Sequence, residues 1–314
     1  MTPEPGPSTA RDGRPAEAGR TVTVIGARRG EDDLAELRRV LEEAGAVVED
    51  LVHLGDRPVT ADELRVRGGG DLASALAPLA RSRGLDVAVQ PAGRRRDATH
   101  LVVMDADSTF LQDEVIDLLA ERAGRGEEVA AITAAAMGGA LDFAASLRAR
   151  VATLEGLAVA VLDEVRADLR LTPGARTLVR TLERHGYLAA VVSGGFVEIL
   201  EPLLTPLGIT RLAANRLEVS GDRLTGRVLG EIVDRAGKAR ALARFAAEAG
   251  VPLERTVAVG DGANDLDMIA LAGLGVAFNA KPAVRAAADA TLSVPYLDAV
   301  LFFLGIPREE FAAS

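Results

Sequence analysis

The segment Leu101–Glu114 constrains this chain more than any other, because an uninterrupted apolar run in it ends in acidic side chains. The run Leu101–Met104 is typical of a central strand in a parallel sheet, which is buried on both faces. Asp105 and Asp107 follow it directly, separated by one alanine. Open α/β sheets bind their ligands at the carboxyl ends of strands, so the pattern predicts a functional site here. Taken alone, the Asp-Ala-Asp sequence also fits a simple Asx-type turn.

Two apolar runs further along the chain end in the same way. Leu188–Val192 is followed by Ser193-Gly194-Gly195, and Thr256–Val259 is followed by the polar segment 260–265, Gly-Asp-Gly-Ala-Asn-Asp. Helical patterns lie between the runs, and one of them, Ala239–Ala249, is preceded by Gly237-Lys238. Because parallel strands share one carboxyl edge, we expect the three polar clusters to lie together.

The three clusters contain the groups that phosphoryl transfer needs. One carboxylate can attack phosphorus, and a second can act as general acid and base. Hydroxyl and backbone N–H groups at Ser193 and Gly194 can hold phosphate oxygens, and a lysine can neutralise charge. A further carboxylate completes an oxygen-rich Mg²⁺ site. Separately, each motif also fits a structural role as a turn, a surface lysine or a polar loop.

Lysine is rare in this chain. Of the 36 basic residues, only Lys238 and Lys281 are lysine, and the others are arginine. A chain that uses arginine almost everywhere keeps lysine where a compact ammonium group is needed, which draws attention to Lys238. Two interpretations stay open for Lys281, in Asn279-Ala280-Lys281-Pro282: it supports the same edge of the sheet, or it has no special role.

The region after the first strand is helical. A helix is expected over Glu114–Ala123, and three amphipathic segments follow before Pro173-Gly174 ends the pattern. These segments lie near Val129–Met137, Leu141–Leu154 and Val159–Asp168. We therefore predict a helical cap over about residues 113–172, inserted after the first strand.

The amino-terminal part of the chain has a different pattern. Residues 1–19 are rich in Pro, Gly, Ser and Ala, which predicts a disordered tail. Residues 20–92 follow the order βαββαβ, the ferredoxin-like α+β pattern, and they resemble an ACT domain. That resemblance implies an amino-acid effector and pairing into a homodimer. The turn 26–31 lacks the Asp and Pro often seen in the ligand-binding loop of ACT domains, so regulation and purely structural pairing both stay open.

Charge and composition exclude several classes of partner. The 314 residues carry a net charge of −10, which argues against nucleic acid and anionic membrane surfaces as partners. There is no cysteine, which excludes disulfides and thiolate chemistry. No apolar run is long enough to span a bilayer and no signal pattern opens the chain, so we expect a cytoplasmic protein.

Five motifs, in this order, resemble those of the phosphoserine phosphatases in the haloacid dehalogenase superfamily. They are DADST from Asp105, MGGALDFAASLRARV from Met137, VVSGGF from Val191, AGKA from Ala236 and VAVGDGAND from Val257. The resemblance extends over Thr99–Pro307 and implies a phosphatase domain at residues 97–309, with a Rossmann-like α/β core, a parallel sheet and the helical cap. It implies Mg²⁺-dependent hydrolysis of O-phosphoserine through an aspartyl-phosphate, the last step of serine biosynthesis.

The same resemblance implies a role for each matching residue. Asp105 would be the nucleophile and Asp107 the acid and base. Mg²⁺ would be bound by the side chains of Asp105 and Asp261 and the backbone carbonyl of Asp107. Phosphate would be bound by Ser193, Gly194 and Lys238, with Asn264 assisting and Asp265 positioning the loop. Glu114 would bind the substrate ammonium and Arg150 its carboxylate, while Met137 and Phe143 close over the substrate.

Two other functions fit the sequence. The chain could transfer the phosphoryl group from Asp105 to another small hydroxyl acceptor, such as homoserine. It could also be an amino-acid-sensing binding protein whose catalytic domain is inactive. Within the cap, Arg148 and Arg150 are two positions apart, so at about 100° per residue they face opposite sides of a helix, and only one can reach the pocket.

Overall fold

A computed structural model describes residues 19–28, 30–92, 98–137 and 141–313. The tail expected over residues 1–19 lies outside this part, except for Gly19. That residue is already ordered in strand β1, where it pairs with Arg67. Among the helices that the structure describes, none combines the length and apolar composition needed to cross a bilayer.

The amino-terminal unit has the predicted βαββαβ order. Its elements are β1 (Gly19–Gly26), α1 (Glu31–Glu43), β2 (Ala46–Gly55), β3 (Thr60–Gly68), α2 (Leu72–Arg83) and β4 (Asp86–Pro91). The four strands are antiparallel in the order β2-β3-β1-β4. Both helices cover one face of this sheet, where Leu37 and Leu41 of α1 pack with Val22 and Leu64. Alternate strand residues therefore supply the small core of this unit.

The second unit is built on a mostly parallel sheet, as the sequence predicts. Its strands run in the order β11-β10-β9-β5-β6-β7-β8. Among the described strands of this unit, neighbours are parallel except for β8, which is antiparallel to β7. The seven strands of this unit are β5 (Leu101–Met104), β6 (Leu188–Phe196), β7 (Arg211–Ser220), β8 (Arg223–Leu229), β9 (Thr256–Gly260), β10 (Leu274–Phe278) and β11 (Ala290–Leu292). The helices are α7 (Ala175–Arg184), α8 (Val197–Leu204), α9 (Arg235–Glu248), α10 (Leu266–Leu271), α11 (Pro282–Ala287) and α12 (Val300–Phe303).

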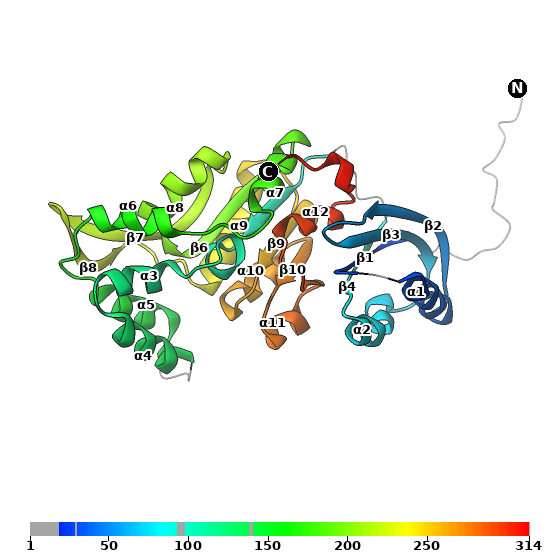
Figure 1. Ribbon diagram of the computed structural model, residues 1–314, viewed down its shortest axis with the longest axis horizontal. Helices are drawn as coiled ribbons and strands as arrows, with labels where there is room; N and C mark the ends of the chain where they lie inside the picture. The colour runs from blue at the N-terminus through cyan, green and yellow to red at the C-terminus, as the bar shows by residue number, and fades with distance from the viewer. Residues whose placement is uncertain (1–18, 29, 93–97, 138–140, 314) are drawn as a thin grey trace, which may run out of the picture.

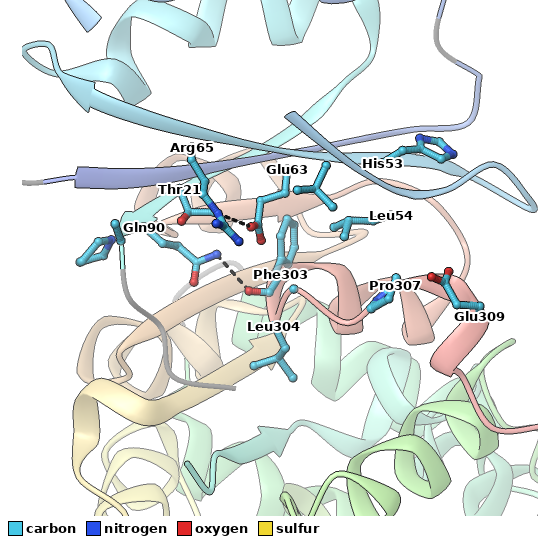
Figure 2. Close-up of a pocket in the computed structure, with 14 residues that line it drawn as sticks. Thr21, His53, Leu54, Glu63, Arg65, Gln90, Phe303, Leu304, Pro307 and Glu309 are labelled. Carbon is cyan, nitrogen blue, oxygen red and sulfur yellow. Dashed lines mark hydrogen bonds and ion pairs between the residues drawn. The ribbon is translucent and has the colours of Figure 1, made fainter. Parts of the chain in front are cut away.

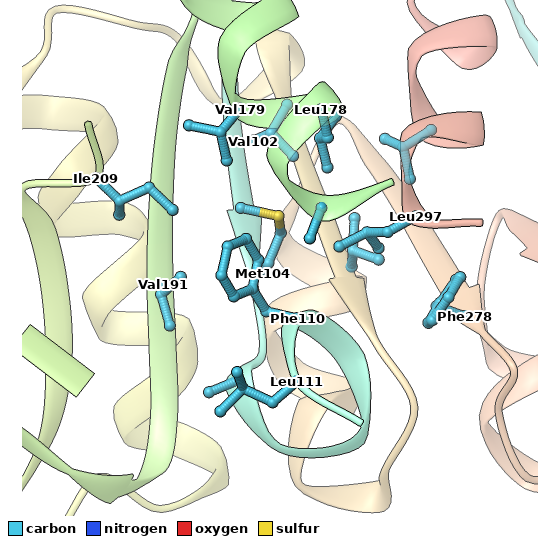
Figure 3. Packing of buried hydrophobic residues seen from close by; sticks show 14 of the residues in the cluster. Val102, Met104, Phe110, Leu111, Leu178, Val179, Val191, Ile209, Phe278 and Leu297 are labelled. Atoms are coloured by element: carbon cyan, nitrogen blue, oxygen red, sulfur yellow. The ribbon is translucent and has the colours of Figure 1, made fainter. Parts of the chain in front are cut away.

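The central strand β5 is buried on both faces. Val102 and Met104 point to one layer, where they pack with Leu178 of α7 and Phe110 (Figure 3). Leu101 and Val103 point to the opposite layer, which contains helices α9 and α10. This burial explains the uninterrupted apolar run in the sequence and fixes the carboxyl end of β5 in the middle of the sheet.

The cap follows β5 directly and lies at the end of the molecule opposite the amino-terminal unit (Figure 1). It contains α3 (Val115–Arg122), α4 (Gly126–Met137), α5 (Phe143–Ala152) and α6 (Ala160–Asp168). The β7–β8 hairpin reaches the cap through backbone hydrogen bonds between Leu224 and both Gly156 and Leu157. The hairpin thus ties the cap to the core on one side.

The two units share one sheet of eleven strands, which the sequence did not indicate. Strand β4 meets β11 through the pair Ala88 and Ala290. Asp86 is buried beside this junction and accepts hydrogen bonds from Thr291 Oγ1 and from the amide and hydroxyl of Ser293. Gln90 donates a hydrogen bond to the carbonyl of Phe303 (Figure 2). Both residues line a pocket between the carboxyl-terminal segment and the face of the amino-terminal sheet that α1 and α2 do not cover.

Two predicted element boundaries were wrong. Strand β6 does not end at Val192 but continues through Ser193-Gly194-Gly195 to Phe196. Helix α9 begins at Arg235 and not after Lys238, because Asp234 caps it by accepting a hydrogen bond from the amide of Gly237 at 2.7 Å. Lys238 therefore projects from the first turn of a helix.

Candidate active site

Asp105 lies at the carboxyl end of β5, where its amide still donates to the carbonyl of Val259 in the neighbouring strand. The chain then makes one wide turn over Ala106–Phe110. Within this turn Ser108 has a φ of +56°, a conformation that is uncommon for residues other than glycine and is frequent at functional sites. The turn returns Asp107 to the same pocket that Asp105 lines.

Asp107 is held by two donors. Its Oδ1 accepts from the amide of Val115 at 3.0 Å, and its Oδ2 accepts from Ser193 Oγ at 3.3 Å. Burial, together with the negative charge of Glu114, raises the pKa of Asp107 to about 7. A carboxyl group with such a pKa can both donate and accept a proton near neutral pH.

Lys238 is fully buried and lies between two carboxylates. Its Nζ is 2.7 Å from Oδ1 of Asp105 and 2.7 Å from Oδ1 of Asp265. Burial disfavours the ammonium form, but the two carboxylates outweigh it and raise the pKa of Lys238. The amide of Ala106 donates to the same Oδ1 of Asp105, so two donors fix the orientation of this carboxylate.

Asp105, Asp261 and Asp265 each offer a carboxylate oxygen, and the three oxygens lie within 4.8 Å of one another. Asp265 is already engaged with Lys238 and the amide of Gly262. Burial and the charge of Asp265 raise the pKa of Asp261 to about 6. Crowded carboxylates with raised pKa values fit a hard divalent cation, which prefers oxygen ligands.

Ser193 and Gly194 occupy the end of the neighbouring strand β6. Ser193 is fully buried, and its Oγ accepts from the amide of Gly195 at 2.7 Å. A Cβ atom at Gly194 would lie 3.0 Å from the ring of Phe143, so the cap closes directly over this glycine. Asn215 supports the segment, since its Nδ2 donates to the carbonyl of Gly194 at 2.8 Å.

The cap side of the pocket carries one carboxylate, that of Glu114, and one guanidinium group, that of Arg150. Glu114 accepts a hydrogen bond from Ser108 Oγ at 2.8 Å. Arg150 lies on α5, and its buried Nε has no hydrogen-bond partner among the described residues. Burial lowers the pKa of Arg150, although Asp117 and Glu114 oppose this. Arg148 is exposed and does not line the pocket. The helical spacing predicted that only one of the two arginines would reach the pocket, and the family resemblance selected Arg150.

Most of the predicted site residues thus meet around one pocket of about 510 Å³. It is lined by Asp105, Asp107, Glu114, Phe143, Arg150, Gly194, Asp261 and Asn264. Ser193, Lys238 and Asp265 lie directly behind it through the contacts above. The side chain of Met137 lies outside the described part of the structure.

Sequence reasoning missed two supporting residues. Asn215 is buried and also accepts from the amide of Val233, so it links the Gly194 segment to the approach to α9. Thr109 Oγ1 donates to Oδ1 of Asp261 at 3.1 Å. Thr109 belongs to the DADST motif and could have been selected from it, whereas no local pattern marks Asn215.

Comparisons with known proteins agree with this geometry. Residues 102–270 match the family model of the haloacid dehalogenase-like hydrolases. A phosphoserine phosphatase of Streptomyces coelicolor is 56% identical over 306 residues, which are 96% of this chain and 75% of that protein. The crystal structure of a probable phosphoserine phosphatase from Vibrio cholerae has a TM-score of 0.75 at 35% identity and covers 92% of this chain and 88% of that chain.

A substrate-bound phosphoserine phosphatase structure has a TM-score of 0.62 at 40% identity, covering 66% of this chain and 98% of that chain. The matches therefore extend over the catalytic unit and, for the Streptomyces and Vibrio proteins, over most of the amino-terminal unit as well. This chain belongs to the haloacid dehalogenase-like hydrolase family.

Proposed function

We infer that this protein is a phosphoserine phosphatase, which hydrolyses O-phosphoserine to serine and phosphate. The observation that carries this inference is the meeting of Asp105, Asp107 and the Ser193–Gly194 segment in one pocket, with Glu114 and Arg150 at its cap side. The phosphoserine phosphatases among the relatives, which match most of this chain, support the same substrate.

In the proposed reaction Asp105 attacks phosphorus and forms an aspartyl-phosphate, while Asp107 gives a proton to the leaving serine oxygen. Asp107 then takes a proton from the water that hydrolyses the intermediate. The pKa of Asp107, near 7, suits both steps. Lys238 and the amide of Ala106 hold the nucleophilic carboxylate in one orientation. Ser193, Gly194 and Lys238 bind the phosphate oxygens, with Asn264 assisting.

The substrate's amino-acid end is recognised from the cap. Glu114 binds the ammonium group and Arg150 binds the carboxylate, so the two ends of a zwitterion meet opposite charges. The unpartnered Nε of Arg150 supports this role, because a buried N–H without a partner is costly unless a ligand accepts its hydrogen bond. Phe143, with Met137 as its proposed companion, covers the substrate above Gly194.

The proposed cofactor is Mg²⁺. The side chains of Asp105 and Asp261 and the backbone carbonyl of Asp107 would hold it, while Asp265 positions the loop through Lys238 and Gly262. When bound, the ion neutralises charge on the phosphoryl oxygens. The raised pKa of Asp261 supports a cation at this position.

For residues 20–92 we propose an ACT-like role in dimerisation or in response to an amino-acid effector, with residues 97–309 as the phosphatase domain. The contacts of Asp86 and Gln90 with the catalytic unit support a physical route between the two. We also propose that the protein acts in the cytoplasm.

Phosphate release from a panel of phosphorylated amino acids and sugars tests the proposed function, with Mg²⁺ present. We expect O-phosphoserine to give the highest kcat/KM and to yield free serine. Preferential turnover of a sugar phosphate would contradict the proposal. Formation of a phosphorylated product when homoserine is added would identify a phosphotransferase instead.

A further inference from the structure

Lys281, for which the sequence left two interpretations open, lies at the catalytic pocket. It directly follows the Asn279-Ala280 loop at the carboxyl end of β10, and β10 pairs in parallel with β9, the strand that precedes Asp261. Lys281 lines the same pocket as Asp105 and Asp107 and is the N-cap residue of α11. The four neighbouring strands β10, β9, β5 and β6 thus all place polar or charged side chains at one edge of the sheet.

The backbone around Lys281 is held in a defined conformation. Asn279 has a φ of +44°, and in the described part of the chain only Ser108 is the other non-glycine residue with positive φ. The amide of Asn279 donates to the carbonyl of Leu292 at 2.9 Å. Pro282 follows Lys281 and favours its extended backbone, which has a φ of −63° and a ψ of 153°. The loop therefore fixes the Cα position from which the lysine side chain extends.

The charges around the pocket make Lys281 different from the other cations there. Lys238 is buried between Asp105 and Asp265. Arg235 lines the pocket but is paired with Asp267, with its Nε 2.7 Å and its Nη2 2.5 Å from the same oxygen. Lys281 is exposed, and within the described ranges no carboxylate lies close enough to pair with it.

An anionic substrate has to approach a protein of net charge −10 and a pocket lined by four carboxylates. Long-range repulsion of this kind slows association, and an unpaired cation at the entrance reduces it locally. Arg150 supplies positive charge on the cap side, but on the core side Lys281 is the exposed cation that no described carboxylate neutralises.

We propose that Lys281 captures the phosphate group of the incoming substrate at the core side of the entrance and sets a preference for dianionic phosphate esters. This role rests on the proposed phosphatase function. Lys281 acts on binding and not on bond breaking, so its charge contributes to kcat/KM through association and KM. The same charge also holds inorganic phosphate, the product, before release.

The test compares Lys281→Gln, Lys281→Arg and a control, Arg285→Gln, in the Mg²⁺-loaded enzyme. Arg285 is exposed on the same helix α11 but lines a different pocket, between α2 and α11. Contributions of exposed ion pairs reach about 1 kcal/mol, so Lys281→Gln should lower kcat/KM for phosphoserine by up to about fivefold at low salt. We expect kcat within about twofold of wild type, and near-normal values for Lys281→Arg and Arg285→Gln.

Ionic strength separates charge from structure. Raising salt from about 0.01 M to about 1 M shortens the screening length from about 30 Å to about 3 Å, so the difference between Lys281→Gln and wild type should disappear. Phosphoethanolamine carries the same phosphate group, so its kcat/KM should fall by a similar factor in Lys281→Gln. Calorimetry with inorganic phosphate should show a weaker Kd in Lys281→Gln by a similar factor.

Three results would overturn the proposal: kinetics of Lys281→Gln equal to those of Arg285→Gln, a loss that persists in high salt, or a loss confined to kcat. Failure of the wild-type enzyme to hydrolyse phosphoserine would contradict the proposed function instead. In that case phosphate calorimetry still decides the role of Lys281, because it does not depend on turnover.

Discussion

Replacing Arg150 by alanine tests how the cap recognises the substrate. Arg150 lines the pocket, and its buried Nε has no partner among the described residues, so the bound carboxylate would be its acceptor. A hydrogen bond to a charged group contributes about 1.5–3 kcal/mol, and about 1.4 kcal/mol corresponds to a factor of ten. Arg150→Ala should therefore lower kcat/KM for phosphoserine about 10- to 100-fold.

The assay is steady-state phosphate release from phosphoserine and from phosphoethanolamine, which lacks the carboxylate. The change should cost little with phosphoethanolamine, because the lost contact is made only with the carboxylate. Arg148→Ala is the matched control, since Arg148 lies on the same helix but is exposed outside the pocket. Equal losses with both substrates, or a larger loss in Arg148→Ala, would refute the assignment of Arg150.

Three further changes test other parts of the site. Asp107→Asn should slow turnover by about 10²- to 10⁴-fold, measured as kcat, because it removes proton transfer while keeping the shape of the side chain; an unchanged kcat would exclude Asp107 as acid and base. The pKa values of Asp261 and Asp107 are raised to about 6 and about 7 in the native state, whereas an aspartate in the unfolded chain has a pKa of about 3.9. Between these values the native state binds protons that the unfolded chain has released. The free energy of unfolding should therefore fall as pH rises through this window. Mg²⁺ binds ionised carboxylates, so it should raise the Tm more at about pH 8 than at about pH 5. An equal rise in Tm at both pH values would contradict this expectation. A chain that begins near Thr99 should still hydrolyse phosphoserine, but light scattering should show loss of the proposed dimer. Thermal melts should show a lower Tm, because the contacts of Asp86 and Gln90 are lost. An unchanged number of subunits and an unchanged Tm would argue against a role of residues 20–92 in assembly.

The sequence alone predicted those features that depend on a local hydrophobic pattern or on the chemistry of neighbouring residues. The apolar run Leu101–Met104 predicted a central strand, and the structure buries it on both faces. The polar clusters at the carboxyl ends of β5, β6 and β9 were expected at one edge of the sheet, and they lie there. Helical periodicity placed Arg148 and Arg150 on opposite sides of their helix, and the family motif selected Arg150 as the one at the pocket.

Other features depend on contacts that no local pattern encodes. The hydrogen bonds of Asp86 join residues more than 200 positions apart, so the junction of the two units could not be foreseen. The link between Asn215 and Gly194 is also a tertiary contact, made by a residue in an ordinary strand. Lys238 was selected for its rarity, but its position between Asp105 and Asp265 emerges only when α9 packs behind the strands.

The central claim is that Asp105 carries the phosphoryl group during turnover. Rapid mixing with phosphoserine labelled in its phosphate, followed by acid quenching and peptide mapping, measures this directly. We expect transient label on the peptide that contains Asp105, at a level approaching one per active site, and none in Asp105→Asn, which should keep its fold and lose turnover. Turnover without a labelled enzyme, label on another residue, or activity in Asp105→Asn would contradict the account.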